Sequence, residues 1–235
     1  MSIWIGTSGY NYPEWKGSFY PRDLRSAEML PFYSSQFDTV EINNTFYRMP
    51  QESALHGWMR ATPERFRLTL KAPQGITHRA RLKNCAEPLQ HFLKMAAVLG
   101  AKRGALLFQL PPNLRSDLSL LAGFLELLPA GIRAAFEFRH PSWLAPAVYQ
   151  QLAARNVALC VADSEKLSTP PEITADYAYF RLRDEAYTGE DIRRWARLIR
   201  ERTGGCSEVF VYFKHEESGK GPQLARALRE ALSAP

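Results

Sequence analysis

Residues 134–139 read Ala-Ala-Phe-Glu-Phe-Arg, a run in which aromatic and charged side chains alternate. Successive side chains of a β-strand point to opposite faces, so Phe136 and Phe138 share one face while Glu137 and Arg139 share the other. The aromatic face suits packing against helices, and the charged face then points into the interior of a closed sheet. The run therefore predicts one strand of a barrel, with charges at its carboxyl end.

Short apolar runs of this kind return along the whole chain. They cover residues 3–6, 39–42, 66–71, 105–109, 134–138, 157–161, 177–182 and 209–213. Helical patterns fill most of the gaps, as at residues 88–99, at residues 191–202 and in the segment that begins near Pro222. Strands that alternate with helices predict repeated βα units and a parallel sheet.

The gap between the sixth and seventh runs is irregular. Pro170 and Pro171 interrupt residues 164–176, and proline lacks the amide hydrogen that a helix interior needs, so the sixth helix is expected to be short or missing. Eight parallel strands favour a closed barrel over a doubly wound open sheet, and residues 6–10 (GTSGY) lack the glycine spacing of nucleotide-binding loops. We expect one α/β domain over residues 1–235, an irregular TIM-type (β/α)8 barrel.

The composition is that of an ordinary globular protein. Of 235 residues, 46% are hydrophobic and 23% are charged, which excludes disordered and collagen-like chains. The net charge of +6 suits an anionic partner. Cys85, Cys160 and Cys206 lie far apart, which argues against a disulfide framework or a cysteine zinc site. Without an apparent signal peptide or a long apolar run, we expect a cytoplasmic protein with no membrane partner.

Sorting each run into two faces places a polar side chain on the inner face near almost every strand end. These residues are Ser8, Glu41, Asn43, Lys71, Gln109, Glu137, Arg139, Asp163, Arg181 and Lys214, with Arg183 as a further candidate. Barrel enzymes assemble their active sites at the carboxyl ends of the strands. The pattern therefore predicts a site there, although solvated strand ends would also explain one or two of these residues.

Glu41 and Glu137 are the strongest candidates of this set. Each stands between large apolar side chains, and a buried carboxylate needs a partner, for which Lys71 and Arg139 are available. A carboxylate pair among cations suits acid–base catalysis, and it equally suits a structural ion-pair network.

Histidines and loops add weaker signals. His140 directly follows the fifth strand and is a candidate base, while His78 and His215 fall in other loops at the same end. No histidine or acidic spacing supports a metal site, so we expect no metal and no cofactor. Residues 218–221 (SGKG) precede the last helix, where either a phosphate site or a plain turn fits.

Aromatic side chains crowd the first two loops. They are Tyr10, Tyr12, Trp15, Phe19, Tyr20, Phe46 and Tyr47. Rings beside cations suit stacking on bases or sugars, and they equally suit packing over the mouth of the barrel.

Long motifs run through the chain: GTSGYNYPEWKGSFYP (6–21), FDTVEINNTFYRMP (37–50), FRLTLKAP (66–73), FQLPP (108–112), FEFRHPSW (136–143) and VYFK (211–214). Together they resemble the YecE-like family, catalogued as domain of unknown function seventy-two. The resemblance spans almost the whole chain and implies a TIM-type barrel for which no reaction is established. Its signature positions map onto Gly6, Ser8, Tyr12, Trp15, Glu41, Asn43, Tyr47, Lys71, Gln109, Glu137, Arg139, His140, Trp143, Asp163 and Arg181.

The chain departs from the family pattern at two places. Relatives tend to have His-Gly after the Arg-Leu of the seventh strand, where this chain has Arg183-Asp184. They tend to have Asn-Asn after the aromatic pair of the eighth strand, where this chain has Lys214-His215. A substrate preference different from that of the relatives would follow.

We therefore expect an enzyme, a hydrolase or isomerase, that acts on a small or oligomeric anionic substrate carrying phosphate. The catalytic candidates are Glu41, Glu137, Asp163 and His140, and the substrate-binding candidates are Ser8, Tyr12, Trp15, Asn43, Tyr47, Lys71, Gln109, Arg139, Trp143, Arg181 and Lys214. Two alternatives stay open, because a barrel fold by itself does not select a function. One is a nucleic-acid-binding or endonuclease-like barrel, and the other is a non-catalytic ligand sensor.

Overall fold

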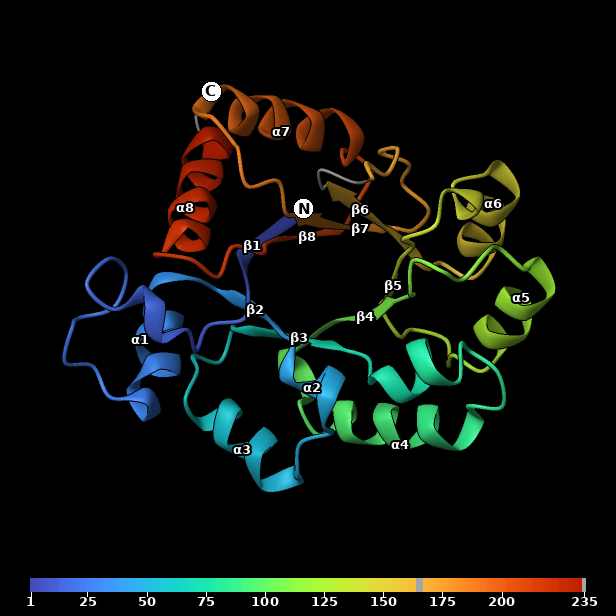
Figure 1. The fold of residues 1–235 in the computed structure, drawn as a ribbon, viewed down its shortest axis with the longest axis horizontal. Coiled ribbons are helices and arrows are strands. Elements are labelled where there is room, and N and C mark those ends of the chain that lie inside the picture. The colour runs from blue at the N-terminus through green and yellow to red at the C-terminus, as the bar shows by residue number, and fades with distance from the viewer. Residues whose placement is uncertain (164–166, 234–235) are drawn as a thin grey trace.

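Eight parallel strands form a closed barrel in the computed structural model, which describes residues 1–163 and 167–233. The strands follow one another around the barrel in chain order, and the first pairs with the eighth (Figure 1). Their bounds are β1 (Ser2–Ser8), β2 (Thr39–Ile42), β3 (Arg67–Lys71), β4 (Arg103–Gln109), β5 (Ala134–Glu137), β6 (Ala158–Asp163), β7 (Tyr177–Leu182) and β8 (Glu208–Phe213). The predicted α/β barrel is confirmed, with each predicted run matching one strand.

Helices surround the barrel on its outside (Figure 1). The helices are α1 (Met29–Gln36), α2 (Asn44–Tyr47), α3 (Glu52–Arg60), α4 (Ala86–Ala97), α5 (Leu118–Glu126), α6 (Pro146–Ala154), α7 (Gly189–Arg202) and α8 (Lys220–Ser233). The three helices predicted from periodicity correspond to α4, α7 and α8. Within residues 1–163 and 167–233, no helix has both the length and the apolar character needed to cross a bilayer.

The connection from β6 to β7 differs from the others. Its described part, residues 167–176, contains no helix, which agrees with the prediction of a short or missing sixth helix. Residues 164–166 of that segment lie outside the described residues. The hydroxyl of Thr174 accepts a hydrogen bond from the Leu159 amide at 2.8 Å and donates to the Val157 carbonyl at 2.7 Å. The hydroxyl of Thr174 thus ties the described part of this connection to the start of β6 and to the residue before it.

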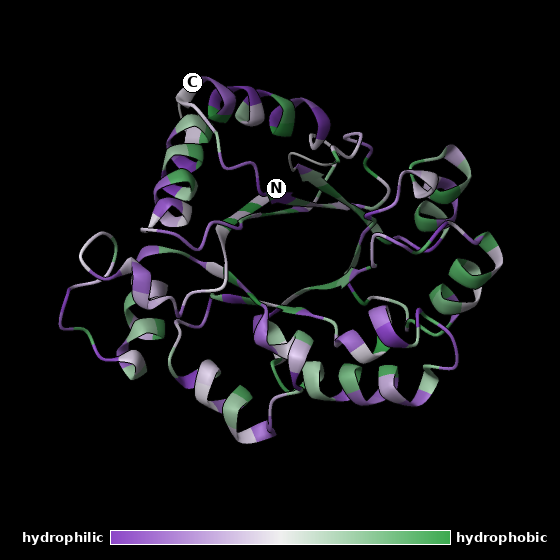
Figure 2. Ribbon diagram, viewed as in Figure 1, coloured by the Kyte–Doolittle hydropathy of each residue, from purple (hydrophilic) through white to green (hydrophobic). Residues whose placement is uncertain are grey.

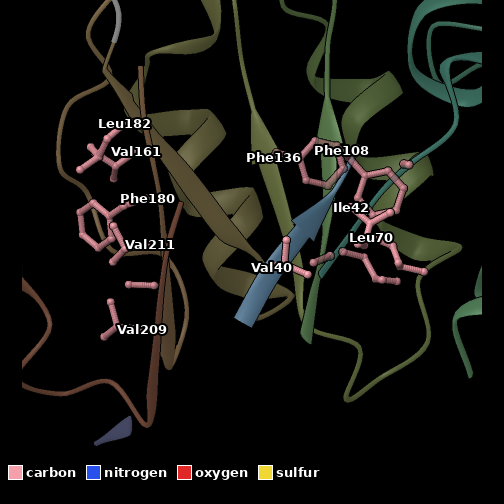
Figure 3. Close-up of a cluster of buried hydrophobic side chains, with 14 of the residues drawn as sticks. Val40, Ile42, Leu70, Phe108, Phe136, Val161, Phe180, Leu182, Val209 and Val211 are labelled. Carbon is pink, nitrogen blue, oxygen red and sulfur yellow. The ribbon is translucent and has the colours of Figure 1, made fainter. Parts of the chain in front are cut away.

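Two apolar layers enclose the strands. The outer layer lies between strands and helices, and Figure 3 shows Val40, Ile42, Leu70, Phe108, Phe136, Val161, Phe180, Leu182, Val209 and Val211 in it. In Figure 2 the helices alternate hydrophobic and hydrophilic bands, as expected for elements with one buried face.

The inner layer fills the barrel itself. It consists of Ala105, Leu107, Ala135, Ala158, Cys160, Ala162, Tyr177, Tyr179, Phe210 and Tyr212. Mostly small side chains from β4 to β6 thus face aromatic rings from β7 and β8. The hydroxyl of Tyr212 lies 2.7 Å from the hydroxyl of Thr39 and 2.8 Å from that of Thr69, so this buried polar atom is satisfied. Because the interior is packed, a functional site belongs at an end of the barrel.

Gly6 leaves room for the Tyr33 side chain to enter between β1 and β2. The hydroxyl of Tyr33 accepts a hydrogen bond from the Thr7 amide at 2.8 Å and donates to the Thr39 carbonyl at 3.1 Å. A Cβ atom at position 6 would lie 2.2 Å from the Thr39 carbonyl oxygen and 2.9 Å from the Tyr33 hydroxyl. The absence of a side chain at Gly6 therefore lets β1 approach β2 closely, two residues before the end of β1.

We expect Gly6→Ala to destabilise the fold by about 2–3 kcal/mol, because the added methyl group forces the backbone of β1 or β2 to move. Gly123→Ala is the matched control, since Gly123 lies in α5 with open space around its Cβ position. It should stabilise the protein by up to about 1 kcal/mol through helix propensity. Urea unfolding of both variants measures the difference. Equal stability of Gly6→Ala and the wild type would contradict the proposed role of Gly6.

Candidate functional site

The guanidinium group of Arg181 is fully buried at the carboxyl end of the barrel. Its Nε lies 3.0 Å and 3.2 Å from the two carboxylate oxygens of Glu41. Its Nη1 donates to Glu137 Oε2 at 3.1 Å, and its Nη2 donates to Ser8 Oγ at 3.1 Å. One side chain from β7 thereby joins β1, β2 and β5. We use the name Arg181 cluster for Arg181, Glu41, Glu137, Ser8, Asn43, Gln109, Tyr179 and Arg139.

Glu41 is held entirely by internal donors. Ser8 stands opposite Glu41 in the register of β1 and β2, and its hydroxyl donates to Glu41 Oε1. The Tyr179 hydroxyl donates to Oε2, and the Asn43 amide donates to Ser8 Oγ at 2.7 Å. Burial and the charge of Glu41 both raise the pKa of Tyr179, which keeps its hydroxyl protonated as a donor. Glu41 is fully buried, and these internal donors satisfy both of its carboxylate oxygens.

Glu137 is the second buried carboxylate, and it is also fully paired. Gln109 donates to Oε2 at 2.8 Å, and Arg139 donates to Oε1 at 3.1 Å. Burial alone would raise the pKa of Glu137, but the charges of Arg181 and Arg139 outweigh it and lower the pKa to about 2. Glu137 is therefore ionised at neutral pH and is a weak base.

Lys71 ends β3 beside this cluster without a partner of opposite charge. Its side chain is 8% exposed, and its Nζ lies 4.1 Å from the centre of the Phe46 ring. In the described part of the chain its ammonium group forms no hydrogen bond and no ion pair. Burial and the charge of Arg181 lower the pKa of Lys71, Arg139 lowers it further, and Glu137 and Glu41 only partly oppose this, so the pKa is about 7.

The loop after β2 holds Phe46 against Lys71. The Thr45 hydroxyl donates to the backbone carbonyl of Lys71 at 2.6 Å and lies 3.1 Å from that of Ile42, which ties α2 to the ends of both strands. The His78 ring packs edge-on against Phe46, with 4.9 Å between ring centres. Burial and the charges of Lys71 and Arg139 lower the pKa of His78, so this imidazole is neutral at pH 7.

Cationic side chains outnumber carboxylates immediately around the Arg181 cluster. Two buried carboxylates stand against Lys71, Arg139, Arg181 and Arg183, and Arg183 lies 3.8 Å from Glu137. The side chains of Arg139 and Arg183 are 29% and 28% exposed, so both reach solvent. Lys214 is also partly exposed, but its Nζ lies 3.4 Å from a carboxylate oxygen of Glu216. The excess charge therefore faces the opening of the barrel.

Two predicted binding residues, Trp15 and Trp143, lie in the hydrophobic core. Both are fully buried. The Trp15 indole donates to the Glu216 carbonyl at 2.8 Å, and the Trp143 indole donates to the Leu114 carbonyl at 2.8 Å and stacks on Phe138. Their indoles thus hold loops at the mouth, and their role in binding stays a prediction.

Two predicted catalytic residues lie outside the cluster as well. Asp163 pairs with Leu182 in the register of β6 and β7, whereas Ala162 pairs with the inward-facing Arg181. Because neighbouring residues of a strand point to opposite faces, Asp163 points to the outer face of the barrel. Its carboxylate accepts a hydrogen bond from the Tyr187 hydroxyl at 2.9 Å. His140 caps the short turn Pro141–Trp143, where its Nδ1 accepts from the Ser142 amide at 3.1 Å. Its Nδ1 lone pair is therefore engaged within its own loop.

The tyrosines of the first two loops have different positions. The Tyr12 hydroxyl donates to the Ser8 carbonyl at 2.9 Å, so Tyr12 supports the cluster from its edge. Tyr47 is 74% exposed and contacts Phe46. Tyr179 belongs to the Arg181 cluster but is not among the predicted site residues. Its place two residues before Arg181 on the same strand face is the signal that could have identified it.

The described residues offer no metal centre. Nowhere in residues 1–163 and 167–233 do three His, Cys, Asp or Glu side chains gather in a way that could hold an ion. The two carboxylates at the centre are neutralised by arginine instead.

The chain belongs to the family described as "Protein of unknown function DUF72", whose model matches residues 4–235. UPF0759 protein YecE of Escherichia coli K12 is 29% identical over 156 residues, which cover 66% of this chain and 55% of YecE, so the match spans about half of that relative. UPF0759 protein YunF of Bacillus subtilis 168 is 24% identical over 98% of this chain and 94% of YunF. The family expected from the motifs is thereby confirmed.

Solved structures agree with this assignment. The DUF72 family protein TM1631 of Thermotoga maritima superposes with a TM-score of 0.89 and 26% identity, and the match covers both chains completely. A methyltransferase from Methanosarcina mazei superposes with a TM-score of 0.53 and 11% identity, over 97% of this chain and 93% of the other. This distant likeness to a barrel enzyme concerns the fold alone.

We expect Arg181→Lys to destabilise the protein by about 3–5 kcal/mol. A lysine ammonium cannot reach Glu41, Glu137 and Ser8 together, so it leaves buried negative charge without a partner. The partly exposed Arg183→Lys is the control and should cost less than about 1 kcal/mol. Urea unfolding at pH 7 measures both. Similar stability of the two variants would remove Arg181 from its central position.

Lys71→Met should stabilise the fold in a pH-dependent way. Above pH 10.5 the lysine is neutral in both the folded and the unfolded state, so its burial carries no electrostatic cost. As the pH falls from 10.5 to 7, only the unfolded state takes up the proton, and the folded wild type loses stability. The advantage of Lys71→Met should therefore grow to of order 4 kcal/mol at pH 7 and level off below it.

This prediction is tested by measuring the free energies of unfolding of the wild type and of Lys71→Met from pH 6 to pH 10. Lys94→Met is the matched control, because Lys94 is exposed on α4 and should give a difference independent of pH. A constant difference for Lys71→Met would show that the lysine keeps an ordinary pKa in the fold.

Proposed function

We propose that this DUF72 protein is an enzyme that binds a small phosphorylated substrate at the carboxyl end of its barrel and hydrolyses or isomerises it. The excess of cationic side chains around the Arg181 cluster carries the proposal. Both buried carboxylates are already neutralised, and Arg139 and Arg183 still extend to solvent. An anionic ligand would balance this charge.

The arginines have separate roles in this proposal. Arg181 donates hydrogen bonds from Nε, Nη1 and Nη2 to other members of the cluster. It would therefore hold these side chains in place and leave the ligand to other residues. Arg139 and Arg183 would hold the phosphate, because the planar guanidinium group offers several donors to neighbouring phosphate oxygens. Arg183 and Lys214 stand where relatives tend to have other residues, so these two positions would set the preference of this chain among phosphorylated compounds.

In this proposal, proton transfer is carried out by Lys71 and His78 and not by the two buried carboxylates. Glu137 is ionised far below neutral pH and Glu41 is fully buried, so both would act electrostatically and not as proton carriers. Lys71 and His78 are better placed, because the pKa values of both are lowered and a neutral amine or imidazole accepts a proton at pH 7. No step in this proposal requires a bound cofactor.

Nucleic-acid binding has less support from the site. Stacking on bases needs exposed rings, but Trp15, Phe19 and Tyr20 of the aromatic-rich loops are buried, whereas Tyr47 is exposed. The net charge of +6 is the remaining argument for it. A ligand sensor would use the same anion site without converting the ligand.

Arg183→Gln should weaken the binding of inorganic phosphate or pyrophosphate about 10-fold, which corresponds to the loss of one charge-assisted contact. Arg202→Gln in the last turn of α7 removes the same charge at the opposite end of that helix and should change the affinity less than about 2-fold. Isothermal titration at low salt gives both values. Equal weakening in the two variants, or no saturable binding to the wild type, would contradict the anion site.

Turnover is tested separately, by 31P NMR of a panel of sugar and triose phosphates incubated with the protein. Conversion by the wild type and by Arg202→Gln, with loss in Lys71→Met, is the expected result. Saturable phosphate binding without conversion of any compound would assign the chain to the ligand sensors. Salt-dependent binding of an oligonucleotide that phosphate does not displace would favour the nucleic-acid function.

A further inference from the structure

Lys71 differs from the other charged groups at the mouth. Arg139, Arg181 and Arg183 all lie close to Glu137, and Lys214 lies close to Glu216. A lysine with only 8% of its surface exposed normally has an anionic partner, because burying an unpaired ammonium group is costly. The described contact of this amine is the face of the Phe46 ring.

The nearby carboxylates cannot serve as that partner. All four oxygens of Glu41 and Glu137 accept hydrogen bonds from other members of the Arg181 cluster. Arg181 and Arg139 further disfavour a second cation beside them, and the nearby His78, whose pKa is lowered, supplies no negative charge. The amine therefore has a large neutral fraction near pH 7, and a neutral amine is a nucleophile.

From this geometry we propose that Lys71 is a Schiff-base-forming residue, and that the substrate is a small phosphorylated aldehyde or ketone. This inference rests on the proposed anion site, which would hold the phosphate beside Arg139 and Arg183. In this arrangement the carbonyl group of the substrate lies next to Lys71, with its carbon within reach of the amine.

The covalent step balances without any further reagent. The Nζ lone pair of the neutral Lys71 amine adds to the carbonyl carbon as the C=O π bond breaks, and one proton passes from the nitrogen to the oxygen to give a neutral carbinolamine. One proton from solvent then converts the hydroxyl group to water, which leaves as the nitrogen lone pair forms the C=N bond of a protonated imine. The imine restores positive charge above the Phe46 ring, where a cation is favoured, and it withdraws electrons from the neighbouring carbon. This electron withdrawal assists isomerisation or cleavage next to the former carbonyl group.

An anion-binding role for Lys71 makes a different prediction. A lysine that serves only as a cation can be replaced by arginine, which keeps the charge. A lysine that forms an imine cannot, because the arginine guanidinium stays protonated and is not nucleophilic. Lys71→Arg therefore separates the two roles.

Pyridoxal 5′-phosphate, an anionic aldehyde, is a suitable probe, and pyridoxine 5′-phosphate is the matched anion without a carbonyl group. The wild type is incubated with the aldehyde and cyanoborohydride, and peptide mass spectrometry measures labelling at each lysine from pH 6 to pH 10. We expect Lys71 to react about 10-fold faster than exposed Lys94 at pH 7, with a midpoint near pH 7.

Lys71→Arg should lose this label while binding pyridoxine 5′-phosphate within about 3-fold of the wild type. Lys94→Met should keep both properties. Two results on the wild type alone would overturn the imine proposal. One is labelling of Lys71 that is no faster than labelling of Lys94, and the other is a midpoint of Lys71 labelling near pH 10. If pyridoxine 5′-phosphate still binds in that case, the anion site stands and only the covalent role fails. If neither compound binds, the proposed function itself fails.

Discussion

The burial of Arg181 is the constraint on which the rest of this end of the barrel depends. Removing a guanidinium group from water costs several kcal/mol, and the cost is recovered only when its donors meet well-placed acceptors. Glu41, Glu137 and Ser8 supply these acceptors from three other strands. The barrel must therefore close in the register that brings β1, β2 and β5 around β7, because any shift would leave buried charges apart.

The same constraint decides which charges remain for a ligand. Once Arg181 and Arg139 neutralise Glu137, its carboxylate no longer attracts a further cation strongly. Lys71 then lies beside positive charge and the Phe46 ring with a lowered pKa, while Arg183 extends outward. In the function that we propose, the ion network at the centre thus leaves the groups at its edge to bind and attack a ligand.

Periodicity predicted the barrel well, since eight short runs with alternating faces leave few other architectures. It also placed Ser8, Glu41, Gln109, Glu137 and Arg181 on one face, and these residues do form one hydrogen-bonded network. The inward placement of Asp163 was wrong for a local reason. Its side chain shares a face with the outer layer, since a shift by a single residue inverts the direction of a strand side chain. The burial of Trp15 and Trp143, which hold loops through their indoles, was not visible in their motifs.

The sequence by itself determined the barrel, the end at which polar groups gather, and the family, because these follow from local alternation and from motifs that are contiguous in the chain. Only the tertiary structure decided how the charges are paired. Whether a carboxylate is free or neutralised, and whether a lysine keeps its proton, depends on groups far apart in the sequence. In this protein Arg181 meets Glu41 across 140 positions of the chain, so the loss of a partner for Lys71 is a property of the closed barrel and not of any motif.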